Sequence, residues 1–372
     1  MKLIIERAAL LRSLAHVQSV VERRNTIPIL ANVLIEASNG LVSLTATDMD
    51  LTIVERTGAN TVEPGATTAP AHTLYDIIRK LPDGSEVELS TSGDGGQLSL
   101  RAGRSNFTLA TLPQEDFPAT ASSDLPQAFE LQVEEAKHLV DRTRFAISTE
   151  ETRYYLNGIY LHAAESGGVG VLRAVATDGH RLARFEMPLP SGAEGMPGVI
   201  VPRKTVGELR KLIDECDSAI EVALSETKVR FTFGRTVLTS KLIDGTFPDY
   251  ERVIPSGNDK VMEVDCKAFA SAVDRVSTIS TEKSRAIKVV LSNGSVTLSA
   301  TSPDAGSAEE DLPIKYDGPT IEIGFNSRYL LDIASQIEGE GAEFTLADAS
   351  SPTIVRDVTD ASALYVLMPM RV

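Results

Sequence analysis

The sequence predicts an α+β protein built from three tandem units that each combine helices with antiparallel strands. The first observation is a repeated landmark, because Ala46-Thr47-Asp48, Ala176-Thr177-Asp178 and Ala300-Thr301-Ser302 each end a β-like run. Their threonines are 130 and 124 residues apart, close to one third of the 372-residue chain. The second observation is that helical and strand-like segments recur in one order, in units of ordinary domain size.

The first unit begins with a helix over 8–21, because Leu10, Leu14, Val17 and Val21 recur at spacings of three and four. Asn39-Gly40 between two β-rich runs predicts a hairpin. A Pro/Gly loop is expected at 63–65 and a second helix at 72–81. Strands are expected at 33–37, 41–48, 51–56, 86–90, 97–100 and 107–110.

The same order returns in the other two units. Helices are expected at 134–145, 203–213, 266–277 and 326–337, and strands at 158–163, 169–176, 220–224, 228–233, 236–242, 287–291, 295–300, 343–346 and 363–368. Asp116-Phe117-Pro118 and Thr246-Phe247-Pro248 close the first two units. Polar linkers near 119–127 and 254–259 then divide the chain into domains 1–122, 128–253 and 259–372, a sixfold pseudo-repeat of six helices and roughly two dozen strands.

Composition restricts the class of protein. The N-terminus has no apolar signal region, and no window approaches about 18 uninterrupted apolar residues. We therefore expect a soluble cytoplasmic protein. Cys216 and Cys266 lie in different units without a neighbouring cysteine, which excludes a disulfide framework and a cysteine zinc site.

Known catalytic and cofactor patterns are lacking. The five histidines contain no i, i+4 pair, and the sequence has neither a Walker-type Gly-Lys-Ser/Thr loop nor a Gly-x-Ser-x-Gly elbow. The glycine-rich stretches 93–96 and 167–170 lie between short strands and are expected to be hairpin turns. We expect no metal, no cofactor and no catalytic residue.

Charge separates between the expected helices and the remainder. The chain carries a formal charge of −16, yet the six helical segments, extended to residues 7–24 in the first, hold 16 Lys/Arg against 8 Asp/Glu. A lightly basic surface results if these helices face a common side, although helix propensity alone also favours Lys and Arg.

Four motifs resemble one family. Tyr154-Tyr155-Leu156-Asn157-Gly158, the stretch 176–183, Phe247-Pro248-Asp249-Tyr250 and the terminal stretch 365–372 are similar to the β sliding clamp of bacterial DNA polymerase III, and the resemblance covers the whole chain. It implies three DNA-clamp domains, each a pseudo-twofold pair of helix-plus-strand units. It also implies a head-to-tail homodimeric ring with helices inside and sheets outside, which encircles duplex DNA and gives the polymerase processivity.

The resemblance assigns three sets of residues. Contacts to double-stranded DNA, independent of sequence, are implied for Arg24, Tyr154, Tyr155, Arg203 and Lys204. A groove for partner proteins is implied at Leu156, Thr177, Gly179, His180, Arg181, Leu182, Pro248, Arg252, Val253, Val366, Met368, Pro369, Met370 and Arg371. A dimer interface is implied between Phe107, Leu109, Arg101 and Arg104 on one subunit and Thr278, Ile279, Glu309 and Glu310 on the other.

The implied groove partners are the DNA polymerase III alpha subunit, the clamp loader and other proteins that carry short clamp-binding peptides. Flexible methionines suit a groove that binds several ligands. Within the turn of the second landmark, Gly179 is expected to permit tight backbone, Leu182 to add apolar surface, and His180 with Arg181 to hydrogen-bond at the rim.

The sequence departs from the family in two places. Glu150-Glu151 replaces a neutral or basic loop, and Ser350 replaces an aliphatic residue, which predicts a more polar groove wall. Two other classes of function stay open: an acid/base enzyme centred on Asp178 and His180, and a scaffold of β-rich units that binds no DNA.

Overall fold

The computed structural model spans residues 1–372 and describes all of them except 25, 92–95, 120–123, 281–284 and 372. Contacts divide the chain into two compact units. Unit 1 comprises Met1–Ala136, Pro190–Ala193 and Lys204–Leu242, and unit 2 comprises Lys137–Leu189, Glu194–Arg203 and Ile243–Val372. The predicted boundaries at 1–122, 128–253 and 259–372 therefore stay a prediction, because each unit takes part of the central segment. The expected linker at 119–127 and the turn at 93–96 lie partly outside the described residues.

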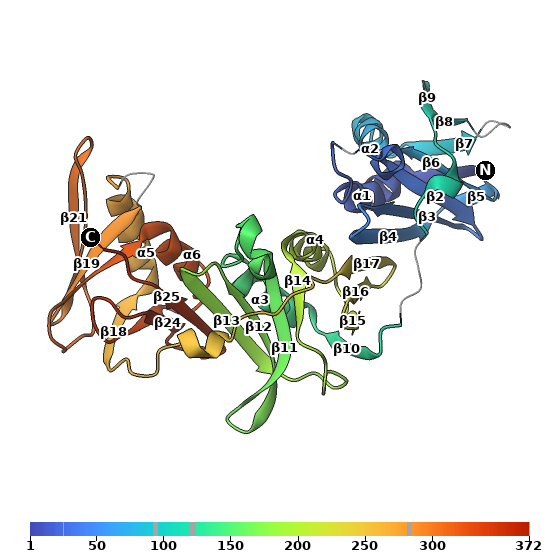
Figure 1. Cartoon of the computed structure of the whole chain (residues 1–372). Coiled ribbons are helices and arrows are strands. Elements are labelled where there is room, and N and C mark those ends of the chain that lie inside the picture. The colour runs from blue at the N-terminus through green and yellow to red at the C-terminus, as the bar shows by residue number, and fades with distance from the viewer. Residues whose placement is uncertain (25, 92–95, 120–123, 281–284, 372) are drawn as a thin grey trace. The chain divides into compact units, whose positions relative to one another are not determined.

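Unit 1 contains two antiparallel sheets (Figure 1). The five-stranded sheet has the order β5 (Asn60–Glu63), β1 (Lys2–Glu6), β7 (Glu86–Thr91), β8 (Gln97–Ala102) and β9 (Ser105–Ala110). The eight-stranded sheet has the order β10 (Gln127–Leu131), β15 (Ile220–Leu224), β16 (Lys228–Phe233), β17 (Thr236–Lys241), β4 (Leu51–Gly58), β3 (Leu41–Thr47), β2 (Asn32–Ser38) and β6 (Gly65–Pro70). Pairing of Leu238 with Ile53 joins distant parts of the chain in this sheet.

Unit 2 also contains two antiparallel sheets. The eight-stranded sheet has the order β14 (Val199–Pro202), β11 (Gly158–Ser166), β12 (Val169–Thr177), β13 (Arg181–Pro188), β25 (Ala363–Leu367), β24 (Thr353–Asp357), β23 (Gly341–Leu346) and β18 (Lys260–Asp265). The four-stranded sheet has the order β21 (Gly306–Pro313), β20 (Ser295–Ser302), β19 (Ala286–Ser292) and β22 (Ile321–Asn326). Here Leu182 pairs with Val366, so the last strand of the chain lies beside β13.

Six α-helices occur in the described residues: α1 (Arg7–Gln18), α2 (Ala71–Lys80), α3 (Val133–Arg144), α4 (Arg203–Asp214), α5 (Cys266–Ser277) and α6 (Ser327–Ala334). Each predicted helix is confirmed to within three residues at either end. In unit 1, α1 packs beside α2 and against β3 and β4, and in unit 2, α5 packs beside α6 (Figure 1). The apolar face of α1 is fully buried at Leu10, Leu14 and Val17.

Several strands escaped sequence analysis. The expected loop at 63–65 is the short connection between β5 and β6, whose sequence Gly-Ala-Thr-Thr-Ala-Pro lacks large apolar residues. Strand β1 is only five residues long, and β13 begins directly after the second landmark turn. The predicted Asn39-Gly40 hairpin is confirmed, with both residues at positive φ between β2 and β3.

The two cysteines occupy different environments. Cys266 begins α5 and is 3% exposed, and burial raises the pKa of its thiol to about 11. Cys216 follows α4, is partly exposed, and donates its thiol to the Ser218 carbonyl at 3.1 Å. Neither forms a disulfide.

A buried arginine joins α3 to the β24–β25 connection in unit 2. Arg142 Nη1 donates to Asp360 Oδ2 at 2.5 Å and to Ser362 Oγ at 3.0 Å, and its guanidinium lies 5.2 Å from the Phe185 ring centroid. Burial alone would raise the pKa of the Asp360 carboxyl, but the hydrogen bonds from Arg142 and Ser362 outweigh it and lower the pKa to about 2.

Asp360→Asn is expected to lower the urea midpoint of unfolding at pH 7. Because the folded pKa is depressed, the carboxylate stabilises the fold above its unfolded pKa of about 3.9, and this contribution is lost as pH falls toward about 2. The gap between variant and parent should therefore shrink below about pH 4. Urea titrations from pH 7 to pH 3, with Asp304→Asn in an exposed turn as the control, test this; a gap that stays constant over that range contradicts it.

Candidate functional site

The landmark at 176–184 forms a closed turn between β12 and β13. Thr177 Oγ1 donates to the Arg181 carbonyl at 2.7 Å and accepts the Gly179 amide at 3.1 Å. Asp178 Oδ1 accepts the amides of His180 and Arg181 at 2.9 and 3.0 Å. Gly179 has φ +87°, so the expectation that glycine permits this turn is confirmed.

The first landmark forms the same turn between β3 and β4. Thr47 Oγ1 donates to the Leu51 carbonyl at 3.0 Å and accepts the Met49 amide at 3.1 Å. Asp48 Oδ1 accepts the amides of Asp50 and Leu51 at 3.0 and 2.7 Å. Met49 takes the place of glycine at φ +81°. The first two landmarks therefore share a backbone conformation as well as a sequence pattern.

These hydrogen bonds weaken the acid/base interpretation of Asp178 and His180. One carboxylate oxygen of Asp178 caps the turn, and the other accepts Arg181 Nε at 3.1 Å. The carboxylate thus holds backbone and guanidinium groups of its own turn. No His, Cys, Asp or Glu group suited to a metal ion occurs in the part of the chain that the structure describes.

Arg181 is a buried connector within unit 2. Its Nη1 donates to Asp332 Oδ2 on α6 at 2.6 Å and its Nη2 to the Phe145 carbonyl at 2.6 Å. Its guanidinium lies 4.2 Å from the Tyr329 ring centroid. The sequence analysis expected Arg181 to hydrogen-bond at the rim of the groove. In the structure its guanidinium is buried, and its hydrogen bonds are made to groups of unit 2.

The residues predicted for the partner groove divide by burial. Leu156, Leu182 and Val366 belong to one apolar cluster with Phe247 and Tyr250, and Leu182 is only 2% exposed. Leu182 was expected to contribute apolar surface, but its side chain lies almost entirely beneath that surface.

The exposed members lie at 248–253 and along the C-terminal tail. Val253 is 52% exposed and Met368 is 41% exposed, while Pro248 and Arg371 are also exposed. The tail is held by its backbone, because Met368 N–H donates to the His180 carbonyl at 2.9 Å and Met370 N–H to the Gly324 carbonyl at 2.8 Å. Arg252 is exposed and forms an ion pair with Asp249 at 2.7 Å. Pro369 and Met370 are partly exposed.

A polar network that sequence reasoning missed fixes the 3-10 helix η4 (Tyr250–Val253). Arg173 Nη1 donates to Glu251 Oε1 at 2.6 Å and to the Tyr250 hydroxyl at 3.2 Å. His162 Nε2 lies 3.0 Å from that hydroxyl, and burial lowers the pKa of His162. No local pattern indicates these partners, because they are 77 to 88 residues apart.

The two departures from the family pattern have local partners. Arg153 forms a two-point ion pair with Glu150 through distances of 2.8 and 2.6 Å, which holds the pKa of Glu150 below its usual range, while Glu151 is exposed. Ser350 lies in an exposed turn, where its hydroxyl donates to Asp348 at 2.9 Å. The first contact pairs one of the two acidic residues of this loop with a cation.

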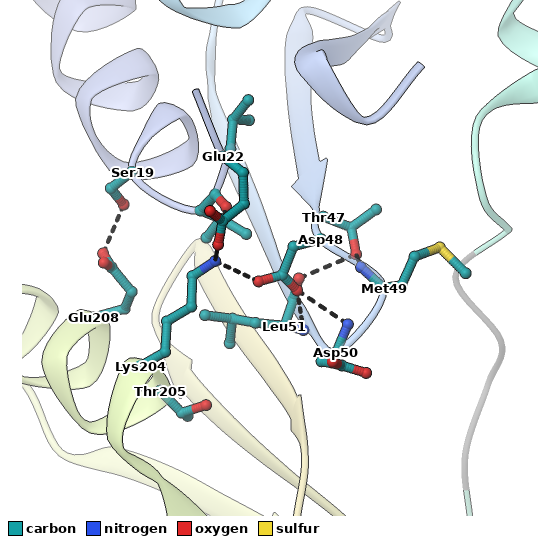
Figure 2. A network of polar contacts seen from close by, with 12 residues as sticks. Ser19, Glu22, Thr47, Asp48, Met49, Asp50, Leu51, Lys204, Thr205 and Glu208 are labelled. Carbon is teal, nitrogen blue, oxygen red and sulfur yellow. Dashed lines mark hydrogen bonds and ion pairs between the residues drawn. The ribbon is translucent and has the colours of Figure 1, made fainter. Parts of the chain in front are cut away.

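The predicted DNA contacts are described within their own units. In unit 1, Arg24 is exposed, whereas Lys204 Nζ lies 2.5 Å from Asp48 Oδ2 and 2.6 Å from Glu22 Oε1 (Figure 2). In unit 2, Tyr154 is 52% exposed, its ring lies 5.7 Å from that of Tyr155, and Arg203 is exposed.

The predicted dimer residues lie at sheet edges or near them. Phe107 and Leu109 lie on β9, the edge strand of the five-stranded sheet, with Arg101 on β8 and Arg104 in the β8–β9 turn. In unit 2, Glu309 and Glu310 lie on the edge strand β21, and Thr278 and Ile279 follow α5. Glu310 forms an ion pair with Arg275 at 2.5 Å.

Family models cover nearly the whole chain. The N-terminal, central and C-terminal domains of the DNA polymerase III beta subunit match residues 1–121, 130–249 and 251–371. The chain belongs to the DNA polymerase III beta subunit family. Its fold of three tandem clamp domains, predicted from the sequence, is thereby confirmed.

Relatives of the family match from end to end. Beta sliding clamps of Caulobacter vibrioides and Escherichia coli K12 are 56% and 39% identical over 100% of both chains. A crystal structure of the C. crescentus clamp, with polyethylene glycol at a proposed β-motif tethering region, has a TM-score of 0.98 at 56% identity and covers 100% of this chain and 99% of the other. A Bartonella birtlesii clamp bound to griselimycin has a TM-score of 0.97 at 53% identity and full coverage of both chains.

None of the helices among the described residues is both long and apolar enough to cross a membrane.

Gly179→Ala is expected to lower the free energy of unfolding by about 1–2 kcal/mol, because an L-residue at φ +87° is strained. Its Cβ would also lie 2.6 Å from Arg153 Nη1, so that side chain must move. Gly207→Ala in α4 is the matched control, since its Cβ meets nothing within 4 Å and should stabilise the helix. Urea unfolding of both variants tests the sign; an unchanged midpoint for Gly179→Ala contradicts the strain.

Proposed function

We propose that the chain works as a sliding clamp, a homodimeric ring that encircles duplex DNA and tethers the replicative DNA polymerase for processive synthesis. The observation that carries this function is correspondence with beta sliding clamps over the full chain in both sequence and fold. The clamp is an accessory subunit of DNA polymerase III and catalyses no reaction itself. Its place of work is the cytoplasm, where bacterial replication occurs.

The charge distribution suits such a ring. Helical segments carry twice as many Lys/Arg as Asp/Glu, in a chain that is acidic overall. Phosphates attract these cations regardless of base sequence, and contacts that are weak and salt-sensitive allow a protein to slide. Topological closure then retains the protein without tight binding.

We assign phosphate or base contacts to Arg24, Tyr154, Tyr155 and Arg203. The two arginines are exposed, and Tyr154 offers an exposed ring on which a base of single-stranded template can stack. Lys204 differs from them, because two carboxylates already bind its ammonium.

The partner site is proposed at the end of the β13–β25 pair in unit 2. Val253 and Met368 are exposed apolar residues, and each lies within three residues in sequence of a member of the buried apolar cluster, Tyr250 and Val366 respectively. Flexible methionine side chains adapt to different peptides, and the tail path is fixed by backbone hydrogen bonds. The occupants are short clamp-binding peptides of the polymerase alpha subunit, the clamp loader and other replication or repair proteins.

Dimerisation is proposed through the edge strands β9 and β21. Each has one side of its backbone without a neighbour in its sheet, so pairing between subunits would extend both sheets. Arg101 and Arg104 would approach Glu309 and Glu310, and these opposite charges would fix the register.

Clamp function predicts retention that depends on DNA ends. After loading onto nicked circular duplex by a clamp loader with ATP, the protein should stay bound, and cutting the circle should shorten its half-life on DNA by at least about tenfold. Gel filtration of the labelled clamp before and after linearisation measures this. Equal release from circles and linear DNA would contradict an encircling ring and leave the scaffold alternative.

The partner site predicts loss of peptide affinity when the tail methionines are shortened. Met368→Ala with Met370→Ala removes the side chains but keeps both backbone hydrogen bonds, and should weaken a fluorescent clamp-binding peptide about 10- to 100-fold. Val358→Ala, an exposed apolar residue in the β24–β25 turn, serves as the control. Full affinity of the double variant in an anisotropy titration would remove these methionines from the site.

A further inference from the structure

Lys204 joins three segments of unit 1 through one ammonium group (Figure 2). Its Nζ donates to Asp48 Oδ2 at 2.5 Å, to Glu22 Oε1 at 2.6 Å and to the Val20 carbonyl at 3.3 Å. Val20 and Glu22 follow α1, Asp48 lies in the β3–β4 turn, and Lys204 lies in the first turn of α4. The ammonium is therefore bound by groups that lie far apart in the sequence.

Asp48 links this ammonium to the closed turn. Its Oδ1 accepts the amides of Asp50 and Leu51, while its Oδ2 accepts Lys204 (Figure 2). The Asp48 side chain is 12% exposed and that of Lys204 is 37% exposed, so solvent screens the pair only partly. Burial would lower the pKa of Lys204, but hydrogen bonds to Asp48 and Glu22 outweigh it and raise the pKa.

Further contacts tie α1 to α4 along the same side. Ser19 Oγ donates to Glu208 Oε2 at 2.6 Å (Figure 2), and Arg12 Nε donates to Glu215 Oε2 at 3.1 Å. Among these contacts, Lys204 is the one that binds Glu22, and the exposed Arg23 and Arg24 directly follow Glu22 in the sequence.

In unit 2 the equivalent turn is also attached to a helix, but there the cation belongs to the turn and the carboxylate to the helix. There Asp178 accepts Arg181 Nε, and Arg181 Nη1 donates to Asp332 on α6. In unit 1 the helix supplies the cation, and in unit 2 it supplies a carboxylate. In both units, therefore, a charged side chain attaches this turn to a helix, although the sign of the charge on the helix differs.

We infer that Lys204 is a positioning residue: it holds Glu22 against the Thr47–Leu51 turn and so directs the chain into Arg23 and Arg24. This inference rests on the proposed function, in which Arg24 contacts DNA. A phosphate at Lys204 would have to displace two carboxylates, whereas Arg23 and Arg24 are exposed.

Lys204→Met separates positioning from phosphate binding through two readouts. Hydrogen exchange at the amides of Asp50 and Leu51 should accelerate about tenfold, because Asp48 loses its anchor. Affinity for a short duplex should fall a few-fold, while the slope of log K against log salt stays unchanged, because the number of phosphates neutralised is the same. Arg24→Met is the control, and should reduce that slope by about one without changing the exchange.

The charge exchange E22K/K204E tests the tie without changing net charge. Positions 22, 48 and 204 of this variant again carry one ammonium and two carboxylates. Hydrogen exchange at the amides of Asp50 and Leu51 should therefore return toward the parent rate. Parent exchange rates in Lys204→Met would overturn the inference, as would a slope reduced by about one in that variant. Circular dichroism of both variants checks folding, and an unfolded Lys204→Met with a folded charge exchange also supports the tie.

The exchange readout needs no DNA. If the parent protein shows no salt-dependent duplex binding, the proposed function fails, while accelerated exchange in Lys204→Met still supports the structural tie. If duplex binding is present and exchange is unchanged, the role inferred for Lys204 fails alone.

Discussion

Backbone pairing between strands that are distant in sequence is the constraint on which the described structure depends. β4 pairs with β17 in unit 1 and β13 pairs with β25 in unit 2, so each eight-stranded sheet draws strands from two of the matched family domains. The repeated turns adjoin these pairings. Because β25 lies beside β13, the C-terminal tail continues past the His180 carbonyl, and exposed Met368 follows closely after Val366, which shares an apolar cluster with Leu182. The proposed partner site is thus a product of sheet continuity, and no single sequence segment contains it.

Local patterns allowed much of the fold to be predicted. Sequence patterns located the six α-helices of the described residues, and the short polar sequences Asn39-Gly40 and Asp178-Gly179 located turns whose backbone requires positive φ. Side-chain partners could not be predicted in the same way. Arg181 was predicted to hydrogen-bond at a groove rim and Lys204 to contact DNA, yet Arg181 bonds to Asp332 and Lys204 to Asp48, at separations of 151 and 156 residues. Their roles depend on which strands and helices meet, and a single sequence carries no local signal for that.

The two closed turns show how one backbone conformation can serve different purposes. Both use threonine and aspartate to satisfy the turn amides, and both place a residue in left-handed backbone. Met49 accepts this conformation at a cost of roughly 1 kcal/mol, and its side chain remains exposed. At Gly179 a side chain would also meet Arg153, which pairs with Glu150 beside the turn. Glycine at position 179 therefore fits two constraints, the positive φ of the turn and the closeness of the Arg153 side chain.

The different environments of the two cysteines make one of them suitable for selective labelling of the thiol. Thiol-directed reagents react with the thiolate, and Cys266 is both buried and held as the thiol at neutral pH by its raised pKa. Cys216 is partly exposed at the end of α4, away from the tail methionines in sequence and on a different sheet-bearing unit. A maleimide dye at pH 7 should therefore mark each subunit once, at Cys216, without removal of any native residue. Fluorescent clamps for single-molecule work could then be prepared from the unmodified chain.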